Sequence, residues 1–433
     1  MSQPDSAVTF PAAGTPVTVE KKSHSRSARS LVLGGSLVML ISMMLVNGFN
    51  FAYNVFMARV LGPSEFGHIN AAITILMLAS CASLTFQLVC AKFVARNEAS
   101  GAKSAIVKSL LGKAWIASLA IAAVLFLGQK PFAAYLNLPS HWMLALLAIG
   151  IAVYAPLGVK RGAMQGLCAF PRLGGNFVVE AFTRFVVGVA LVVAGYGALG
   201  AVGAISAAVL MAYFIPPMPR EVRTDPVAGE PASFAEAVQA IVFFIGQVII
   251  NNIDILLVKH FFPAEPAGIY AAIAQVGRLL YFICWFGIVN AMFPIAASRQ
   301  EEKRSGALGV PLLLVLAISL LFVGGTALFP NFIMGLIFGS KFIHIGPLLA
   351  LYAAATALYS LSVVLIAYEM SRRIANTGWL QLLVSAALIL VIGFFHHDLH
   401  EVIIVRIVLM VLMLGLVSFP FVRRFLRAPV EAT

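Results

Sequence analysis

The chain has 433 residues, of which 61% are hydrophobic and 11% are charged, and its net charge is +12. Soluble domains are about 45–50% apolar and about 25% charged, so this composition excludes a soluble globular protein and indicates a polytopic membrane protein. The positive charge does not indicate nucleic-acid binding, because it lies in short connections between apolar segments, where cytoplasmic loops carry Lys and Arg.

Twelve apolar segments follow one another along the chain, each long enough to cross a bilayer as a helix of about 20 residues. Residues 1–30, rich in Ser, Pro and Thr, are predicted to be a disordered cytoplasmic tail, since the segment that follows is too long for a signal peptide. The sequence thus predicts an all-α integral membrane protein with twelve transmembrane helices. The segments fall near 31–58, 66–91, 106–128, 141–159, 173–195, 198–219, 234–258, 267–297, 307–329, 346–369, 374–395 and 401–422.

The longest connection between apolar segments covers residues 220–233, and its Asp225-Pro226 and Glu230-Pro231 steps are typical of a linker. It divides the chain into two predicted lobes of six helices each. These domains are 31–219 and 234–424, with a cytoplasmic tail at 425–433.

The distribution of Lys and Arg predicts the orientation. With the N-terminus in the cytoplasm, 21 of the 29 cationic residues lie on the cytoplasmic side and four on the outer side. The remaining four lie within spans. This bias predicts cytoplasmic termini at both ends of a multi-pass protein of the cell inner (cytoplasmic) membrane. Because six is an even number, the lobes would form a parallel pseudo-repeat about an axis along the membrane normal.

A short sequence of the first lobe returns in the second. Residues 59–67 read RVLGPSEFG, and residues 259–268 read KHFFPAEPAG. An echo of this length predicts two homologous halves, the usual plan of a transporter that opens alternately to the two sides of a membrane. The matched pairs are Arg59 with Lys259, Pro63 with Pro263, Glu65 with Glu265 and, after one extra residue, Gly67 with Gly268.

Polar side chains form a stripe on the first helix of each predicted lobe. Helical spacing places the members of each set on one face, and polar groups inside a bilayer favour an interior or a hydrated cavity. The alternative is that the amides join helices to one another. The two sets are Asn47, Asn50 and Asn54, and Gln247, Asn251 and Asp254.

Ionisable residues inside the spans predict an anionic cargo. Arg184 and Arg278 lie near the predicted midplane, Lys113 and Glu180 lie nearer the cytoplasm, and Asp254 lies in the outer third. This cationic excess suits a phosphate or diphosphate group held by Arg or Lys. The predicted substrate-binding residues are therefore Arg184, Arg278, Lys113, Asn47, Asn50, Asn54, Gln247 and Asn251.

Asp254 and Glu180 are the candidates for coupling transport to H⁺ or Na⁺. Structural alternatives remain open for these residues. Glu180 and Arg184 are four residues apart and could neutralise each other, and Arg278 could pair with Asp254. Lys113 and Arg406 could extend to the membrane surface.

Motifs for chemistry or for ATP binding are absent from the sequence. There is no phosphate-binding loop of the Walker type, no G-x-S-x-G and no H-E-x-x-H. The histidine-rich stretch 396–401 fits a polar interfacial turn better than a metal site, because ligand types without geometry are weak evidence. We expect a protein that is not an enzyme and needs no metal or organic cofactor.

Three stretches resemble one protein family. These stretches are similar to segments of oligosaccharide flippases. They are residues 59–67 with the following Asn70-Ala71-Ala72, residues 252–257 through Gly268-Ile269-Tyr270, and residues 338–342 with Pro347-Leu348-Leu349. Such flippases belong to the polysaccharide-transport branch of the multidrug/oligosaccharidyl-lipid/polysaccharide exporter superfamily. The resemblance spans about residues 31–424.

The resemblance implies a V-shaped transporter of two six-helix lobes. Its cargo would be a polyprenyl-diphosphate-linked oligosaccharide, moved from the inner to the outer leaflet for O-antigen, capsule or exopolysaccharide biosynthesis. Its partners would be membrane lipids and the polysaccharide polymerase machinery. Arg184, Arg278 and Lys113 fit the cationic residues that meet the diphosphate in this family.

Two alternatives belong to the same superfamily. A multidrug/cation antiporter would favour an acidic cavity, which this sequence lacks. A flippase for the peptidoglycan lipid precursor would resemble chains with fourteen spans, whereas twelve are predicted here.

Overall fold

The computed structural model describes residues 23–97, 99–216, 234–285, 288, 308–372 and 377–427, and the regular structure in these ranges is helical. The helices are α1 (Ser23–Arg96), α2 (Ser100–Leu127), α3 (Gln129–Tyr135), α4 (Trp142–Ala152), α5 (Tyr154–Gly166), α6 (Phe170–Val193), α7 (Gly197–Phe214), α8 (Phe234–Ile250), α9 (Ile253–Phe261), α10 (Ala264–Cys284), α12 (Gly309–Leu328), α13 (Pro330–Phe338), the 3-10 helix η3 (Ser340–Ile345), α14 (Gly346–Arg372), α15 (Leu380–Phe394) and α16 (Leu399–Arg427).

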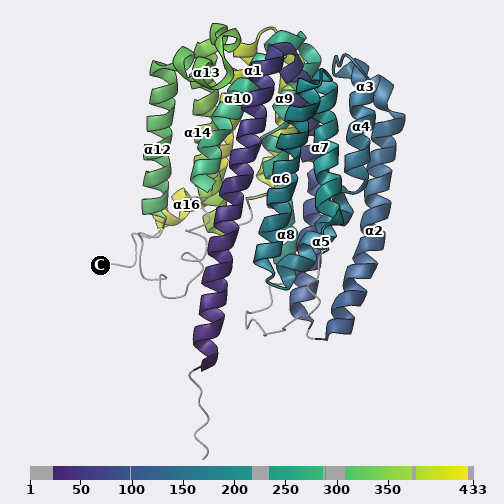
Figure 1. Cartoon of the computed structure of the whole chain (residues 1–433). Coiled ribbons are helices and arrows are strands. Elements are labelled where there is room, and N and C mark those ends of the chain that lie inside the picture. The colour runs from purple at the N-terminus through teal and green to yellow at the C-terminus, as the bar shows by residue number, and fades with distance from the viewer. Residues whose placement is uncertain are drawn as a thin grey trace, which may run out of the picture.

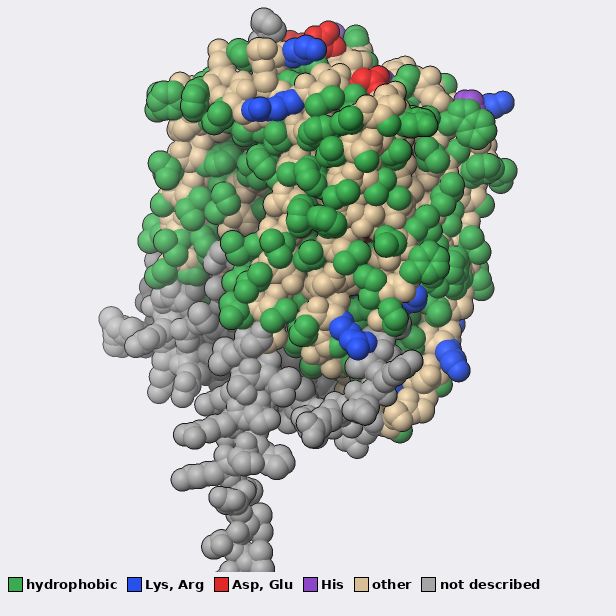
Figure 2. Space-filling model, viewed as in Figure 1, with side chains coloured by type: hydrophobic (Ala, Val, Ile, Leu, Met, Phe, Trp, Pro, Cys, Tyr) green, Lys and Arg blue, Asp and Glu red, His purple; other side chains and the backbone are tan. Residues whose placement is uncertain are grey.

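Ten helices in the described residues are long and apolar enough to cross a membrane. The longest, Leu37–Arg96 of α1, has 60 residues, while α15 is apolar but has only 15 residues. Apolar side chains cover the middle of the face seen in Figure 2, and charged side chains gather toward its ends. The chain is therefore an all-helical, multi-pass membrane protein.

The long helix α1 is two helices joined by a sharp turn. Gly62 has φ 80° and ψ 178°, a conformation that is essentially restricted to glycine, and Pro63 follows it. The turn separates a first half of α1, residues 23–61, from a second half, residues 63–96. The break falls between the two apolar segments that the sequence predicts near 31–58 and 66–91.

A second break, between α4 and α5, precedes Pro156, whose ring cannot follow a regular helical turn. Hydroxyl groups of neighbouring helices bind the backbone on both sides of this break, as buried polar backbone in a membrane interior requires. Ser118 of α2 donates its hydroxyl to the carbonyl of Ile151 (2.6 Å), and Ser83 of α1 donates to the carbonyl of Tyr154 (2.8 Å). The break is thus held in place by both neighbours.

Glycines bring α5 close to the second half of α1. Gly158, Gly162 and Gly166 recur every four residues and face α1 so closely that a methyl group at any of them would meet α1 atoms. Small residues at this spacing let membrane helices approach. Arg161 lies on the same helix and is only 4% exposed, so it is carried into the interior.

The N-terminal and C-terminal helices form two groups. In Figure 1, α2, α4 and α7 lie on the right and α12 and α14 on the left, with α1 and α6 between them. We call α1–α7 the N-lobe and α8–α16 the C-lobe.

The two echo segments meet where the lobes join. A Cβ atom on Gly67 would lie 3.0 Å from the backbone of Gly268 and 3.1 Å from the carbonyl oxygen of Ala264, and a Cβ atom on Gly268 would overlap the carbonyl oxygen of Pro63. With the offset that matches Gly67 to Gly268, which is one residue larger than the offset that matches Pro63 to Pro263, Pro63 corresponds to Ala264. The contacts of Gly67 with Ala264 and of Gly268 with Pro63 are then equivalent. The contact is therefore self-complementary, as expected about a two-fold axis that relates the lobes.

Polar contacts join the lobes at the same end of the molecule. Asn137 donates to the carbonyl of His260 (2.9 Å), and Lys259 donates to the carbonyl of Asn137 (3.2 Å). The His260 ring stacks on Tyr135 at 3.6 Å, and Arg59 donates to two carbonyls in the last turn of α13. Figure 1 places α3, α9 and α13 at this end, near the turn of α1. We call this region the joined end.

Some sequence predictions differ from the structure, and others lie outside the residues it describes. Ser23–Ser30, expected in a disordered tail, belong to α1. The predicted linker 220–233 and residues 1–22 and 428–433 lie outside the described residues. The seventh apolar segment, predicted as one helix over 234–258, is divided into α8 and α9 at Asn251 and Asn252, so its polar stripe lies at a break.

Candidate functional site

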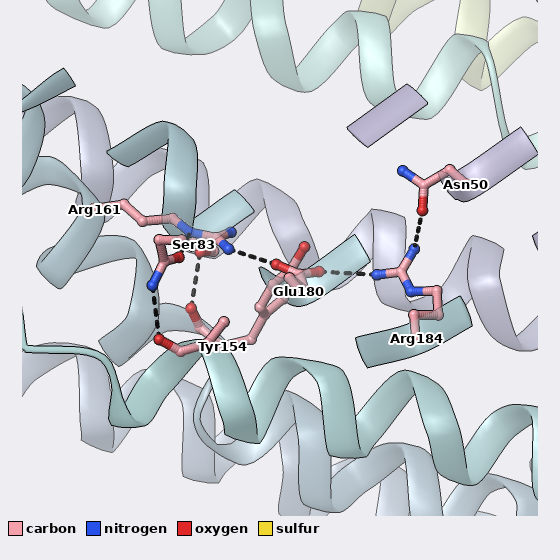
Figure 3. Close-up of polar contacts among 8 residues, drawn as sticks. Asn50, Ser83, Tyr154, Arg161, Glu180 and Arg184 are labelled. Carbon is pink, nitrogen blue, oxygen red and sulfur yellow. Dashed lines mark hydrogen bonds and ion pairs between the residues drawn. The ribbon is translucent and has the colours of Figure 1, made fainter. Parts of the chain in front are cut away.

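The N-lobe holds a carboxylate between two guanidinium groups (Figure 3). Glu180 of α6 accepts a hydrogen bond from Arg161 on one oxygen (2.5 Å) and from Arg184 on the other (2.8 Å). Arg161 comes from α5, whereas Arg184 lies one turn after Glu180 on α6. We call Asn50, Arg161, Asn176, Glu180 and Arg184 the N-lobe cluster, and its three ionised groups leave one surplus positive charge.

Arg161 is fixed by several contacts besides Glu180. Its Nε donates to Asn176 (2.8 Å), and Asn176 in turn donates to the carbonyl of Ala212 on α7 (2.7 Å). Its guanidinium also lies 4.1 Å from the ring centre of Phe177, within the range of a cation–π interaction. With a side chain only 5% exposed, Arg161 is a rigid, buried partner of Glu180.

Arg184 is held less firmly. It donates from Nη2 to Glu180 (2.8 Å) and from Nη1 to Asn50 of α1 (3.1 Å). Its Nε has no hydrogen-bond partner among the described residues, and its side chain is 13% exposed. Arg184 is therefore the most accessible charged member of the N-lobe cluster, and it links α6 to the first half of α1.

The C-lobe holds a second cluster of one carboxylate and two guanidinium groups, arranged differently. One oxygen of Asp254, Oδ2, accepts from Arg406 (2.6 Å), Tyr270 (2.8 Å) and Tyr352 (3.0 Å). The Arg406 side chain is 1% exposed and that of Asp254 is 0% exposed. We call these four residues, with Asn252 and Arg278, the C-lobe cluster; its ion pair is sealed from solvent.

Arg278 of α10 stands apart from that ion pair. Its Nη1 donates to the side chain of Asn252 (2.8 Å), at the break between α8 and α9. Its Nε and Nη2 have no hydrogen-bond partner in the described part of the chain, although the residue is only 6% exposed. Nε–H and Nη2–H form one edge of the guanidinium, the fork that binds a carboxylate or phosphate through two parallel hydrogen bonds.

The sequence prediction for these charges was right in part. The ion pair between Glu180 and Arg184, one of its alternatives, is present. Pairing of Asp254 with Arg278 is wrong, because Asp254 pairs with Arg406. Extension of Arg406 to the surface is wrong for the same reason. These partners lie on helices far apart in the sequence, so spacing along one helix could not identify them.

Arg161 is the charged residue that sequence reasoning missed. It follows Lys160 directly, and the pair resembles a cytoplasmic loop at the end of an apolar segment. In the structure α5 continues to Gly166, beyond the predicted end at residue 159. The small residues at 158, 162 and 166 are the sequence signal that could have placed Arg161 against a neighbouring helix.

The other predicted residues are dispersed. Asn47 is exposed, and Lys113 is exposed on α2. Asn54 and Asn251 donate to backbone carbonyls one turn earlier on their own helices, at residues 50 and 247. Gln247 is buried, and its Nε2 has no partner within the described ranges. The structure thus brings Asn50 to Arg184 but does not gather all the amides into one site.

The histidine-rich turn does not form a metal site in the described residues. His397 contacts Glu401 at 2.9 Å, and no group of three or more potential metal ligands occurs among the residues searched.

Comparisons with known proteins give both a family match and structural neighbours. A family model described as a polysaccharide biosynthesis protein matches residues 56–347. An inward-facing multidrug resistance MATE family transporter of the MOP superfamily has a TM-score of 0.71 at 12% identity, with 90% of this chain and 99% of that chain covered. No match was found among curated proteins.

Two further structures relate to the conformation. The lipid II flippase MurJ in an inward closed conformation gives a TM-score of 0.70 at 11% identity, covering 90% of this chain and 89% of that one. An outward-facing MATE family transporter gives 0.55 at 15% identity, covering 91% and 95%. At these identities the comparisons establish the shared fold alone. These neighbours are described as transporters and a flippase.

Proposed function

This chain belongs to the polysaccharide biosynthesis protein family, and we propose that it is a flippase for a polyprenyl-diphosphate-linked oligosaccharide. It would carry this lipid from the inner to the outer leaflet of the cytoplasmic membrane, for the synthesis of a surface polysaccharide such as O-antigen, capsule or exopolysaccharide. The family description and the lipid II flippase among the structural neighbours support a lipid-linked cargo.

The proposal includes a topology of twelve spans with both termini in the cytoplasm. The ten candidate helices become twelve when the two halves of α1 are counted separately and the shorter α15 is included. In this topology the joined end faces outward, and the lobes are closed there. The higher TM-score to the inward-facing MATE family transporter than to the outward-facing one, 0.71 against 0.55, supports an inward-facing state of this kind.

The observation that carries the proposal is the free edge of Arg278. A buried donor without a partner costs about 1–3 kcal/mol, and Arg278 carries two on adjacent nitrogen atoms. A diphosphate oxygen pair would satisfy both donors. The two clusters together contain four guanidinium groups and two carboxylates, so an anionic headgroup would be stabilised and a cationic drug would be repelled.

The coupling ion is a separate part of the proposal. Asp254 is 0% exposed, and Arg406 and two tyrosines all bind its Oδ2, while its Oδ1 has no partner among the described residues. A cation would therefore have to enter a site that is closed to solvent in this state. Glu180 is the better candidate for H⁺ or Na⁺, because one of its partners, Arg184, is partly exposed.

The test is the leaflet distribution of lipid-linked sugars in a strain that lacks the gene. We expect polyprenyl-diphosphate oligosaccharides to accumulate in the inner leaflet, and wild-type protein to reverse this. Arg278→Gln should fail to reverse it at normal membrane levels, Arg278→Lys should restore part of the activity, and the exposed control Arg172→Gln should behave as wild type.

A normal leaflet distribution without the gene would contradict the proposal and favour the multidrug/cation antiporter. Accumulation of the peptidoglycan precursor alone would instead identify the other lipid flippase of the superfamily. Full activity of Arg278→Gln would remove this residue from the site.

A further inference from the structure

We propose that Glu180 and Arg161 are positioning residues that control when Arg184 can bind the anionic headgroup. This inference rests on the proposed function. Arg184 is the exchangeable partner of Glu180, and Arg161 is its permanent partner. Neither Glu180 nor Arg161 needs to touch the cargo.

The hydrogen bonds of Arg184 show why it is held back in this state. Two-point binding of an oxyanion on the exposed edge of a guanidinium uses Nε–H and Nη2–H together. In Arg184, Nε is without a partner within the described residues, but Nη2 donates to Glu180. Nη2 carries two hydrogens, one of which goes to Glu180. A phosphate on the same nitrogen would bring its charge beside the Glu180 carboxylate, so the two anions compete for Arg184.

Arg161 makes the release of Arg184 possible. A buried carboxylate left without a cation is strongly unfavourable in a low-dielectric interior. Each oxygen of Glu180 has its own guanidinium, and Arg161 is fixed by Asn176 and Phe177. When Arg184 turns toward a phosphate, Glu180 keeps Arg161, so no uncompensated negative charge remains.

The same exchange would act on the position of α1. Arg184 donates to Asn50, which lies on the first half of α1. The two terminal nitrogens of Arg184 are bound at the same time, Nη1 by Asn50 and Nη2 by Glu180. Rotation of the planar guanidinium toward a ligand would therefore weaken both hydrogen bonds. Binding of the headgroup would thereby weaken a direct link between α1 and α6.

The test is a cycle of variants in the purified full-length protein, with farnesyl diphosphate as the ligand and farnesol as the uncharged control. Isothermal titration calorimetry gives Kd for the diphosphate. Arg161→Gln should weaken binding about tenfold or more, because Arg184 then becomes the sole partner of Glu180. Glu180→Gln should tighten binding, because the competitor for Arg184 loses its charge.

The decisive member is the double variant Arg161→Gln/Glu180→Gln. If Arg161 acts through the charge of Glu180, removing that charge should restore binding to within about threefold of Glu180→Gln. A purely structural role of Arg161 would predict no rescue. Arg161→Lys, which keeps the cation, should bind within about threefold of wild type, and Arg172→Gln is the matched control on an exposed site.

Separate outcomes distinguish the two proposals. If wild-type protein does not bind farnesyl diphosphate better than farnesol, the proposed function and the positioning role both fail. If wild type binds but the double variant remains as weak as Arg161→Gln, only the positioning role fails. If Arg161→Gln does not fold, the other variants decide. Weak binding of the diphosphate by folded Arg161→Lys overturns the positioning role. A folded double variant that binds the diphosphate as Glu180→Gln does supports it.

Discussion

The N-lobe cluster and the C-lobe cluster contain the same ionised groups, one carboxylate and two guanidinium groups, in different arrangements. In the N-lobe, two guanidinium groups share Glu180, one on each oxygen, and the outer partner Arg184 is 13% exposed. In the C-lobe, Arg406 and two tyrosines converge on a single oxygen of Asp254, and Arg278 has no contact with that carboxylate among those observed.

This difference between the two clusters indicates that the ion pair of the C-lobe cluster stabilises the fold, whereas Arg278 and Arg184 are the groups available for binding under the proposed function. A sealed ion pair such as Asp254 with Arg406 cannot exchange partners without exposing a buried charge, so it belongs to the framework of its lobe. Arg278 keeps two donors, Nε and Nη2, without a partner among the described residues. Arg184 is instead held by Glu180 and Asn50. Under the proposed function, a headgroup would bind Arg278 without disturbing an ion pair, whereas binding to Arg184 would disturb its pair with Glu180.

The largest expected effect is the loss of one member of the sealed pair. Asp254→Asn or Arg406→Gln should each destabilise the protein by about 3–5 kcal/mol, because the remaining buried charge loses the opposite charge with which it is paired. The double variant should recover much of this loss. Thermal unfolding of the detergent-solubilised protein measures the effect.

The matched experiment in the N-lobe is Arg184→Gln. Glu180 keeps Arg161 in this variant, so the free energy of unfolding should fall by about 1 kcal/mol or less, as for a partly exposed pair. Equal destabilisation by Arg184→Gln and Arg406→Gln would show that the two clusters do not differ in the way we describe.

The second-largest expected effect is a weaker contact between the lobes when Gly67 or Gly268, which meet at the joined end, is replaced. Gly268→Ala should disfavour the joined-end contact by about 1–3 kcal/mol, since its methyl group would overlap the carbonyl oxygen of Pro63. Gly67→Ala should have a smaller effect, because its nearest contacts at 3.0 Å need only a few tenths of an ångström. Gly48→Ala, with no atom within 4 Å, is the control.

A cysteine introduced at half-buried Ser64 can report whether the lobes separate at the joined end. In a background without the four native cysteines, Gly268→Ala should raise the rate of labelling by a membrane-impermeant maleimide about tenfold if the contact is weakened by 1.4 kcal/mol. Equal labelling of the Gly268 and Gly48 variants would mean that the echo segments do not close the joined end.

Much of the fold is predictable from the sequence, because the length of an apolar segment and the position of helix-breaking residues such as Gly and Pro are local properties. Gly62-Pro63 lies between two apolar segments and forms the turn of α1. The spacing of Glu180 and Arg184 on one helix predicts their ion pair. Both follow from neighbours in the chain. The echo around Gly67 and Gly268 predicts homologous halves, but the contact between these two segments is a finding of the structure.

The candidate site is less predictable, because its main contacts join distant segments. Asp254 and Arg406 are 152 residues apart, and their contact depends on how α9 and α16 pack. The pair of Arg161 and Glu180 depends on the extension of α5 past the predicted end of its span. Depth along a helix identified Arg184 and Arg278 as buried, but it could not tell which guanidinium was already occupied.

The smallest expected effect is at Lys113, which the sequence places with Arg184 and Arg278 as a substrate-binding residue. In the structure Lys113 is exposed on α2, at a position away from the buried face of that helix. Lys113→Gln should change stability by about 0.5 kcal/mol or less, and it should leave the leaflet distribution of lipid-linked sugar within about twofold of wild type. Both measurements use the assays above, with Arg184→Gln in parallel. A loss of flipping equal to that of Arg184→Gln would place the exposed face of α2 on the path of the headgroup, and the anion would then be bound by three cations and not by the two clusters alone.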